Sequence, residues 1–127
     1  MGAVLNMAFV TDGKDLEVYK RAFAFSVELH HASLGFPKIE QYSLADQIRR
    51  ASKSVCANLV EGFDRQQYSK PEFKRFLMMA SSSAAEVSVW LDYAHQLEYI
   101  AAEQHQAWAA ECKKINRMLH KLRAKAD

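Results

Sequence analysis

The sequence predicts an all-α protein that folds as an antiparallel four-helix bundle with up-down-up-down topology. Apolar residues recur at helical spacing in four long segments, and short connections separate these segments, so consecutive helices should run antiparallel. Only 4 Gly and 2 Pro occur in 127 residues, too few for a turn-rich β protein. We expect a flexible N-terminal segment over residues 1–14, the bundle over 15–124 and a C-terminal tail over 125–127.

Composition is that of an ordinary globular domain, with 50% hydrophobic and 25% charged residues, which excludes a disordered chain. Cys56 and Cys112 do not form a metal-binding pair, so we expect reduced thiols and an intracellular, cytoplasmic protein. The apolar stretch from Met1 to Val10 lacks a basic start and is too short to span a bilayer, so no membrane partner is expected. Met7 is a possible native start.

The first helix should run from about Asp15 to Leu34 and has apolar residues on two opposite faces. We take the first face as the side that packs in the core, which makes His30 a packed histidine. The Gly35-Phe36-Pro37 sequence should end this helix. The first face comprises Leu16, Tyr19, Phe23, Val27, His30 and Leu34, and the second comprises Val18, Ala22, Phe25 and Leu29.

The second helix should begin after Ser43 as N-cap and end at Gly62. Three stripes run along it. A core stripe is formed by Leu44, Ile48, Ala51, Val55 and Leu59; a polar stripe by Arg50, Ser54, Asn58 and Glu61; and a second apolar stripe by Ala45, Cys56, Val60 and Phe63. An isolated bundle would leave the second apolar stripe in water, which indicates assembly with other chains.

The third helix has the clearest start: Ser69 as N-cap, Pro71 in the first turn and Glu72 at the capping-box position. It should continue to about Glu98. Its core face comprises Phe73, Phe76, Leu77, Ala80, Ala84, Val87, Leu91 and Ala94, and a further apolar stripe comprises Met79, Trp90, Tyr93 and Leu97. The fourth helix should span about Ala102 to Ala124, with Trp108, Cys112, Ile115, Leu119 and Leu122 facing inward.

Polar residues on the second and third helices predict a structural network. Glu86 interrupts an apolar stripe, and a carboxylate in apolar surroundings must be paired or hydrogen-bonded. In an antiparallel pair we expect Asn58 to lie at nearly the height of Glu86. The predicted buried network therefore consists of Arg50, Asn58, Glu61 and Glu86.

An enzymatic alternative is a metal-dependent carboxylate centre in the bundle core. Glu28 and His31 have Glu-x-x-His spacing, and Asp92 and His95 form an acidic analogue. However, Glu28 falls in a charged wedge away from the core face, and the second helix offers no carboxylate at the matching height. We therefore expect no catalytic residues, no metal and no cofactor.

Basic residues give the remaining functional signal. The net charge is only +2, so local clustering must carry any nucleic-acid binding. No base-reading motif is evident, and binding would therefore be electrostatic and directed to phosphates. The candidate phosphate-binding residues are Arg49, Lys53, Lys70, Lys74, Lys113, Arg117 and Lys121.

Several motifs occur together in a recognisable order: Asp15-Leu16-Glu17-Val18-Tyr19-Lys20-Arg21-Ala22, Gln47-Ile48-Arg49-Arg50-Ala51, Ala57-Asn58-Leu59-Val60-Glu61-Gly62-Phe63 and Ser69-Lys70-Pro71-Glu72-Phe73-Lys74-Arg75-Phe76-Leu77, then Ala85-Glu86. Over roughly Asp15 to Ile100 the chain resembles the bacterial four-helix bundle proteins encoded by intervening sequences of large-subunit ribosomal RNA genes. That family commonly has Trp in place of Tyr19 and Pro in place of Cys56.

The resemblance implies a homopentameric ring with no known enzymatic activity. It also implies kinship with the accessory variability determinant of diversity-generating retroelements, which binds nucleic acid and a reverse transcriptase. We therefore expect a non-enzymatic homo-oligomer that binds RNA or DNA and scaffolds a protein partner, possible partners including a reverse transcriptase. A metal-dependent enzyme and a purely protein–protein assembly module remain the alternatives.

Overall fold

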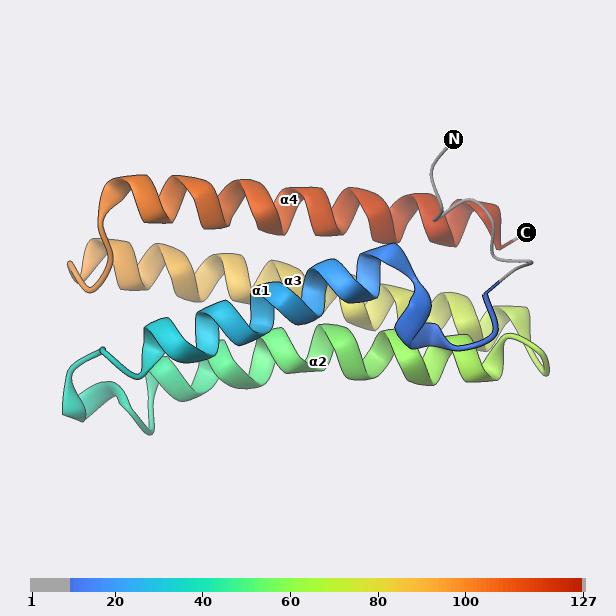
Figure 1. The fold of residues 1–127 in the computed structure, drawn as a ribbon, viewed down its shortest axis with the longest axis horizontal. Coiled ribbons are helices and arrows are strands. Elements are labelled where there is room, and N and C mark those ends of the chain that lie inside the picture. Colours follow the sequence, from blue (N-terminus) through green and yellow to red (C-terminus); the bar gives the residue numbers. More distant parts are fainter. Residues whose placement is uncertain (1–9, 127) are drawn as a thin grey trace.

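The structure is a computed structural model that describes residues 10–126, and these form an antiparallel bundle of four helices. The helices are α1 (Glu17–Ser33), α2 (Leu44–Arg65), α3 (Lys70–Gln96) and α4 (Ala102–Lys125), with short 3-10 helices η3 (Gly13–Asp15) and η4 (Lys38–Glu40). Within the described residues there is no strand, as predicted. The α2–α3 connection and the C-terminal end of α4 lie at the same end of the bundle (Figure 1).

The predicted core stripes of α2, α3 and α4 are confirmed, because all of their residues are buried. Gly62 lies within this core rather than at a helix end. A Cβ added there would lie 2.7 Å from Cβ of Phe76, so glycine permits the close approach of α2 and α3. The prediction that the second helix ends at Gly62 was therefore wrong: α2 continues to Arg65.

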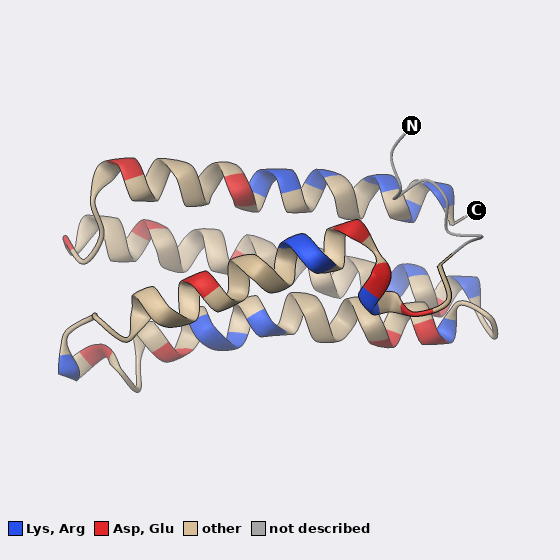
Figure 2. Ribbon diagram, in the orientation of Figure 1, with Lys and Arg blue, Asp and Glu red and all other residues tan. Residues whose placement is uncertain are grey.

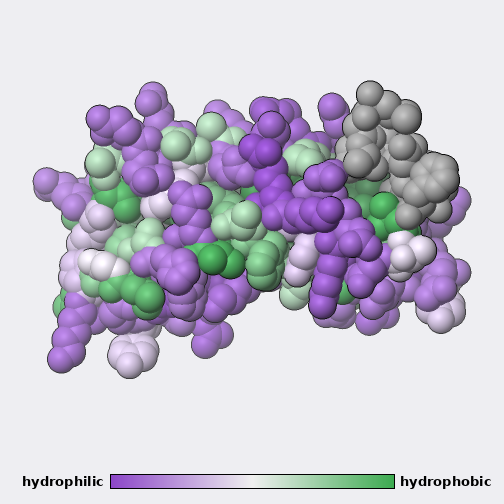
Figure 3. Space-filling view, in the orientation of Figure 1, coloured by the Kyte–Doolittle hydropathy of each residue, from purple (hydrophilic) through white to green (hydrophobic). Residues whose placement is uncertain are grey.

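Helix α1 packs with the opposite face from the one that we took as the core side. Val18, Ala22, Phe25 and Leu29 are buried, whereas Phe23 is 52% exposed. The sequence carries two apolar faces of similar character, and periodicity alone cannot tell which one enters the core. Helix α1 runs obliquely across the bundle, and hydrophobic residues remain at the surface along it (Figures 1 and 3).

The helix boundaries show which local signals are used. The Ser69 side chain caps α3 by accepting a hydrogen bond from the Glu72 amide at 3.2 Å, as predicted. Ser43 precedes α2 but its side chain makes no capping bond; Oε1 of Glu40 accepts from the Leu44 amide at 3.3 Å instead. Helix α3 ends at Gln96 because the chain turns at Glu98, which has a positive φ of 65°.

The segment before α1 is partly structured. Residues 13–15 form η3, the side chain of Asp12 accepts a hydrogen bond from the Lys14 amide at 2.9 Å, and Gly13 is buried against Val60 and Phe63 of α2. The rest of the expected flexible segment, residues 1–9, lies outside the described residues. In the described part of the chain, no helix has the length and apolar character needed to cross a membrane.

Candidate interaction surfaces

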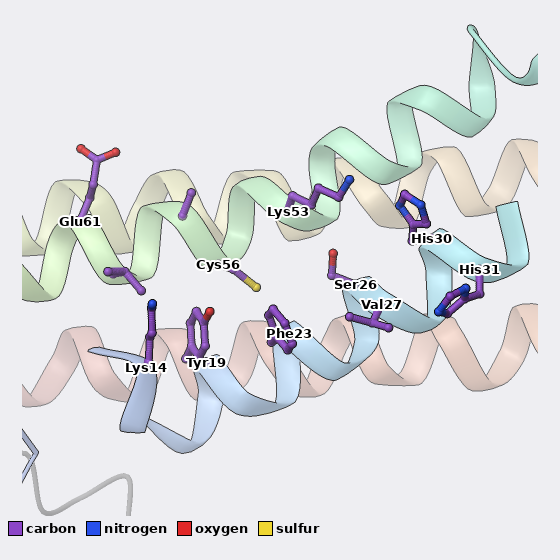
Figure 4. Close-up of a pocket in the computed structure, with 12 residues that line it drawn as sticks. Lys14, Tyr19, Phe23, Ser26, Val27, His30, His31, Lys53, Cys56 and Glu61 are labelled. Carbon is purple, nitrogen blue, oxygen red and sulfur yellow. The ribbon is translucent and has the colours of Figure 1, made fainter. Parts of the chain in front are cut away.

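An apolar groove lies between α1 and α2 and has a volume of about 680 Å³. Tyr19 and Phe23 extend from α1 toward Cys56 on α2, and Lys53 and His30 lie toward one end (Figure 4). We call this surface the α1/α2 groove. It is lined by Lys14, Tyr19, Phe23, Ser26, Val27, His30, His31, Lys53, Cys56, Ala57, Val60 and Glu61.

The groove places titratable groups against apolar walls. Burial raises the pKa of the Cys56 thiol to about 11, and burial is also the main cause that raises the pKa of Tyr19. The pKa of His30 is lowered, first by desolvation and then by the charges of Lys53, Arg49 and His31. These shifts favour the neutral forms of all three side chains. The prediction placed His30 on the core face, which was wrong, because its face of α1 lines this groove and leaves His30 half-buried.

A second apolar surface follows α3 on its outer side, and we call it the α3 stripe: Met79, Glu86, Trp90, Tyr93 and Leu97. Tyr93 is 55% exposed and Leu97 is 48% exposed. Within the stripe, Nε1 of Trp90 donates a hydrogen bond to Oε2 of Glu86 at 3.0 Å, and the Trp90 and Tyr93 rings lie 5.9 Å apart. The sequence correctly predicted that this stripe lies outside the bundle core.

The predicted second apolar stripe of α2 behaves differently. Ala45 and Cys56 are buried, and Val60 and Phe63 are half-buried, because α1 and η3 cover this side of α2. The expectation that an isolated bundle would leave this stripe in water was therefore wrong for most of its length. What reaches the surface is the α1 wall of the groove.

The expected buried polar network is not formed within one chain. Glu86 is exposed and bonds only to Trp90, Glu61 is exposed with its carboxylate 3.7 Å from Arg65, and exposed Arg50 pairs with Asp46 at 2.8 Å. These residues lie on the outer flanks of α2 and α3, where water and neighbours one helical turn away satisfy them.

The helix register explains why Asn58 and Glu86 do not meet. Oγ of Ser83 donates a hydrogen bond to Oγ of Ser54 at 2.9 Å, which sets these two residues at one height. From this pair Asn58 and Glu86 lie in opposite directions, which separates them by about 10 Å along the bundle axis. Asn58 instead donates to the Ser54 carbonyl at 2.9 Å and to its hydroxyl at 3.0 Å.

Basic residues gather where the start of α3 lies beside the second half of α4 (Figure 2). We call this surface the basic end: Lys70, Lys74, Lys113, Lys114, Arg117, Lys121, Arg123 and Lys125. Lys70, Lys113, Arg117 and Lys121 are exposed and Lys74 is half-buried. No acidic residue occurs on α4 after Glu111. Five of the seven candidate phosphate-binding residues thus lie on the start of α3 and the second half of α4.

The other two candidates lie elsewhere. Arg49 ties the α1–α2 connection to α2: Nη1 donates to Oγ of Ser33 at 2.8 Å, and Nη2 donates to the Gln41 carbonyl at 2.6 Å. Its guanidinium is therefore occupied by a structural role, and we correct its assignment to phosphate binding. Lys53 is exposed but lines the α1/α2 groove, away from the basic end.

The residues considered for a metal centre do not converge. Oε2 of Glu28 accepts a hydrogen bond from Nε1 of Trp108 at 2.9 Å, facing α4. His105 lies 2.7 Å from Asp92 and stacks on His95 with ring centroids 4.4 Å apart. Among residues 10–126 no group of three or more His, Cys, Asp and Glu side chains could hold a metal ion.

Both thiols are held in the neutral form. Burial raises the pKa of Cys112 to about 12, higher still than that of Cys56. A thiol with so high a pKa is a poor nucleophile near neutral pH. Both cysteines are free and buried, and their side chains pack in the bundle.

Sequence reasoning missed two contacts that join α1 to its neighbouring helices. The hydroxyls of Ser26 and Ser52 lie 2.9 Å apart in a buried hydrogen bond between α1 and α2. Arg21 pairs with Glu111 at 2.8 Å and links α1 to α4. A serine on an otherwise apolar face is the signal that could have indicated the first contact; the second has no local signal, because its partners are far apart in the sequence.

Comparison with protein families matches residues 14–121 to the family described as 23S rRNA-intervening sequence protein. The chain belongs to this family. The match covers most of the chain and confirms the resemblance that the motifs carry.

Among solved structures, this family member is similar to the crystal structure of a protein with unknown function from the S23 ribosomal protein family of Bacteroides thetaiotaomicron. The two share 25% sequence identity with a TM-score of 0.75, over 84% of this chain and 95% of the other. A search of curated proteins found no match.

Proposed function

We propose that this chain is a non-enzymatic homo-oligomeric bundle, with five subunits as the resemblance implies, that binds RNA or DNA through the phosphate backbone. The observation that supports the proposal is the basic end, where the start of α3 and the second half of α4 carry lysines and arginines. Membership of a family described by a ribosomal RNA intervening sequence agrees with a nucleic-acid partner.

The distribution of charge supports this surface over the rest of the molecule. Between Phe76 and Cys112 the chain has no lysine or arginine, whereas the second half of α4 is densely basic. No ion pair between described residues involves Lys113, Arg117 or Lys121, so their charges are available to an anion. An oligomer would repeat this surface in each copy, and phosphate contacts would then add across subunits.

Beside the basic end, Tyr68 is 84% exposed, and a single aromatic ring does not form a platform on which successive bases stack. The aromatic residues Phe73 and Phe76 at the start of α3 are buried in the bundle. Binding through phosphates alone should be weakly dependent on base sequence and strongly dependent on salt.

The test is fluorescence anisotropy with two unrelated RNA oligonucleotides and two unrelated DNA oligonucleotides, measured between about 50 and 200 mM salt. Combined Lys113→Glu, Arg117→Glu and Lys121→Glu changes should weaken binding alike for all four probes. The magnitude of the negative slope of log affinity against log salt concentration should decrease by about three, because each lost phosphate contact reduces that magnitude by about one unit. Lys38→Glu, at the opposite end of the bundle, is the control and should bind as wild type.

Equal binding by the triple variant and wild type would contradict the assignment of the basic end. Absence of binding to any probe at low salt would leave protein–protein assembly as the function. Scaffolding of a protein partner, such as a reverse transcriptase, is a separate part of the proposal and is tested by co-purification of the two proteins.

A further inference from the structure

The α1/α2 groove and the α3 stripe are both apolar, and each runs along a helix. Along α1 the groove extends from Tyr19 to His30, about 17 Å, and the stripe extends from Met79 to Leu97, about 27 Å. Both expose large apolar side chains, with Phe23 52% exposed in the groove and Tyr93 55% exposed on the stripe. Exposed apolar surface of this kind marks an interaction site.

The two surfaces are also complementary in charge. The groove is bordered by Lys14 and Lys53, while its one acidic residue, Glu61, points away from α1 (Figure 4). The stripe has a carboxylate, Glu86, in its middle and lies in the part of the chain that has no lysine or arginine. Among the described residues, Lys53 has no ion pair.

Lys53 and Glu86 lie at nearly the same height in the bundle. The Ser54–Ser83 hydrogen bond sets the register of α2 and α3, and from this pair both residues lie toward the same end. At 1.5 Å per residue their heights differ by only about 3 Å. Copies related by rotation about an axis parallel to the bundle would present the two side chains to each other without any shift along that axis.

One chain cannot bring these surfaces together, because they lie on different sides of α2. Ser52 faces α1, as its bond to Ser26 shows, and Ser54 faces α3. Neighbouring sides of a four-helix bundle point roughly at right angles, and contacts at such an angle close a ring of about four or five copies.

We propose that the α1/α2 groove of one copy receives the α3 stripe of the next, with Lys53 opposite Glu86, in a head-to-tail ring. This inference rests on the homo-oligomeric part of the proposed function and names its interface. It does not depend on nucleic-acid binding.

The test is a charge exchange followed by sedimentation velocity over a range of protein concentrations. Lys53→Glu and Glu86→Lys each place like charges in the contact, and each should raise the concentration at half-assembly by about tenfold or more. The double variant restores an opposite pair and should assemble close to wild type. Lys38→Glu and Glu103→Lys make the same charge changes outside both surfaces and should leave assembly unchanged.

Circular dichroism checks that every variant remains helical, so a misfolded variant is not counted. If the wild-type protein is an oligomer and both single variants form the same oligomer at the same concentrations, this interface is wrong. The proposal that the chain forms an oligomer would still stand. Two weakened singles without recovery in the double variant would show that the residues do not face each other, and a monomeric wild type would refute the ring. Loss of nucleic-acid binding in variants of the basic end that still assemble would bear on the proposed function alone.

Discussion

Helix α3 carries two apolar stripes that contrast within one element. On its inner stripe Phe73, Leu77 and Leu91 are at most 1% exposed, whereas Tyr93 and Leu97 on the outer stripe are about half exposed. Both stripes follow helical periodicity and use residues of similar hydrophobicity. The difference teaches that the inner stripe specifies the fold of one chain, while the outer stripe is free to specify contact with another.

The largest effect should come from the inner stripe. Leu91→Ala removes a fully buried side chain from the bundle core. It should lower the free energy of unfolding by about 2–5 kcal/mol, because lost apolar transfer adds to the cost of a cavity. Urea denaturation followed by circular dichroism measures the change. A loss below about 1 kcal/mol would show that this position is less well packed than its burial indicates.

An equivalent truncation on the outer stripe should weaken assembly of the oligomer without weakening the fold of the single chain. Tyr93→Ala should leave the helical content unchanged and weaken the oligomer, since the lost contacts lie between chains. Met78→Ala is the matched control, because Met78 is similarly exposed, at 52%, on the flank of α3 that faces α4. Analytical ultracentrifugation of both variants compares them. If Tyr93→Ala and Met78→Ala assemble equally well, the outer stripe is not the flank of α3 that contacts another chain.

The smallest effect concerns Cys56, which lies at the border between the core and the groove. Its pKa is raised from 9.0 to about 11, so the folded chain keeps the proton over a pH range in which the unfolded chain releases it. Stability should therefore fall as pH rises from about 9 to 11. Urea denaturation across this range, with Cys56→Ala as control, measures the effect. The free energy of unfolding of Cys56→Ala should decline less steeply with pH than that of the wild type. Parallel curves for the two proteins would contradict the raised pKa of Cys56.

The sequence predicted the inner stripes well because burial there follows directly from helical spacing. Every predicted core residue of α2, α3 and α4 is buried, and Ser69 caps α3 as expected. Helix α1 was harder, since its two apolar faces obey the same period and only packing selects between them. The sequence cannot show that Gly62 lies at a close approach of two helices rather than at a helix end.

The candidate sites depended on register and on loop path, which the sequence specifies poorly. Asn58 and Glu86 were misplaced relative to each other because the connection between α2 and α3 sets an offset that spacing does not reveal. Arg49 was predicted to bind phosphate. Its hydrogen bond to the Gln41 carbonyl could not be predicted from the sequence, because it depends on the path of the chain between α1 and α2. Locating the lysines and arginine of α4 required only helical geometry and the antiparallel topology, and α4 packs against α3, which carries Lys70 and Lys74.

The central claim is that the outer apolar surfaces join copies of this chain. Multi-angle light scattering of the wild-type protein at micromolar concentration tests it most directly. The account predicts a mass of about four or five times the chain mass of 14.5 kDa, without dependence on nucleic acid. A mass near 14.5 kDa would contradict it.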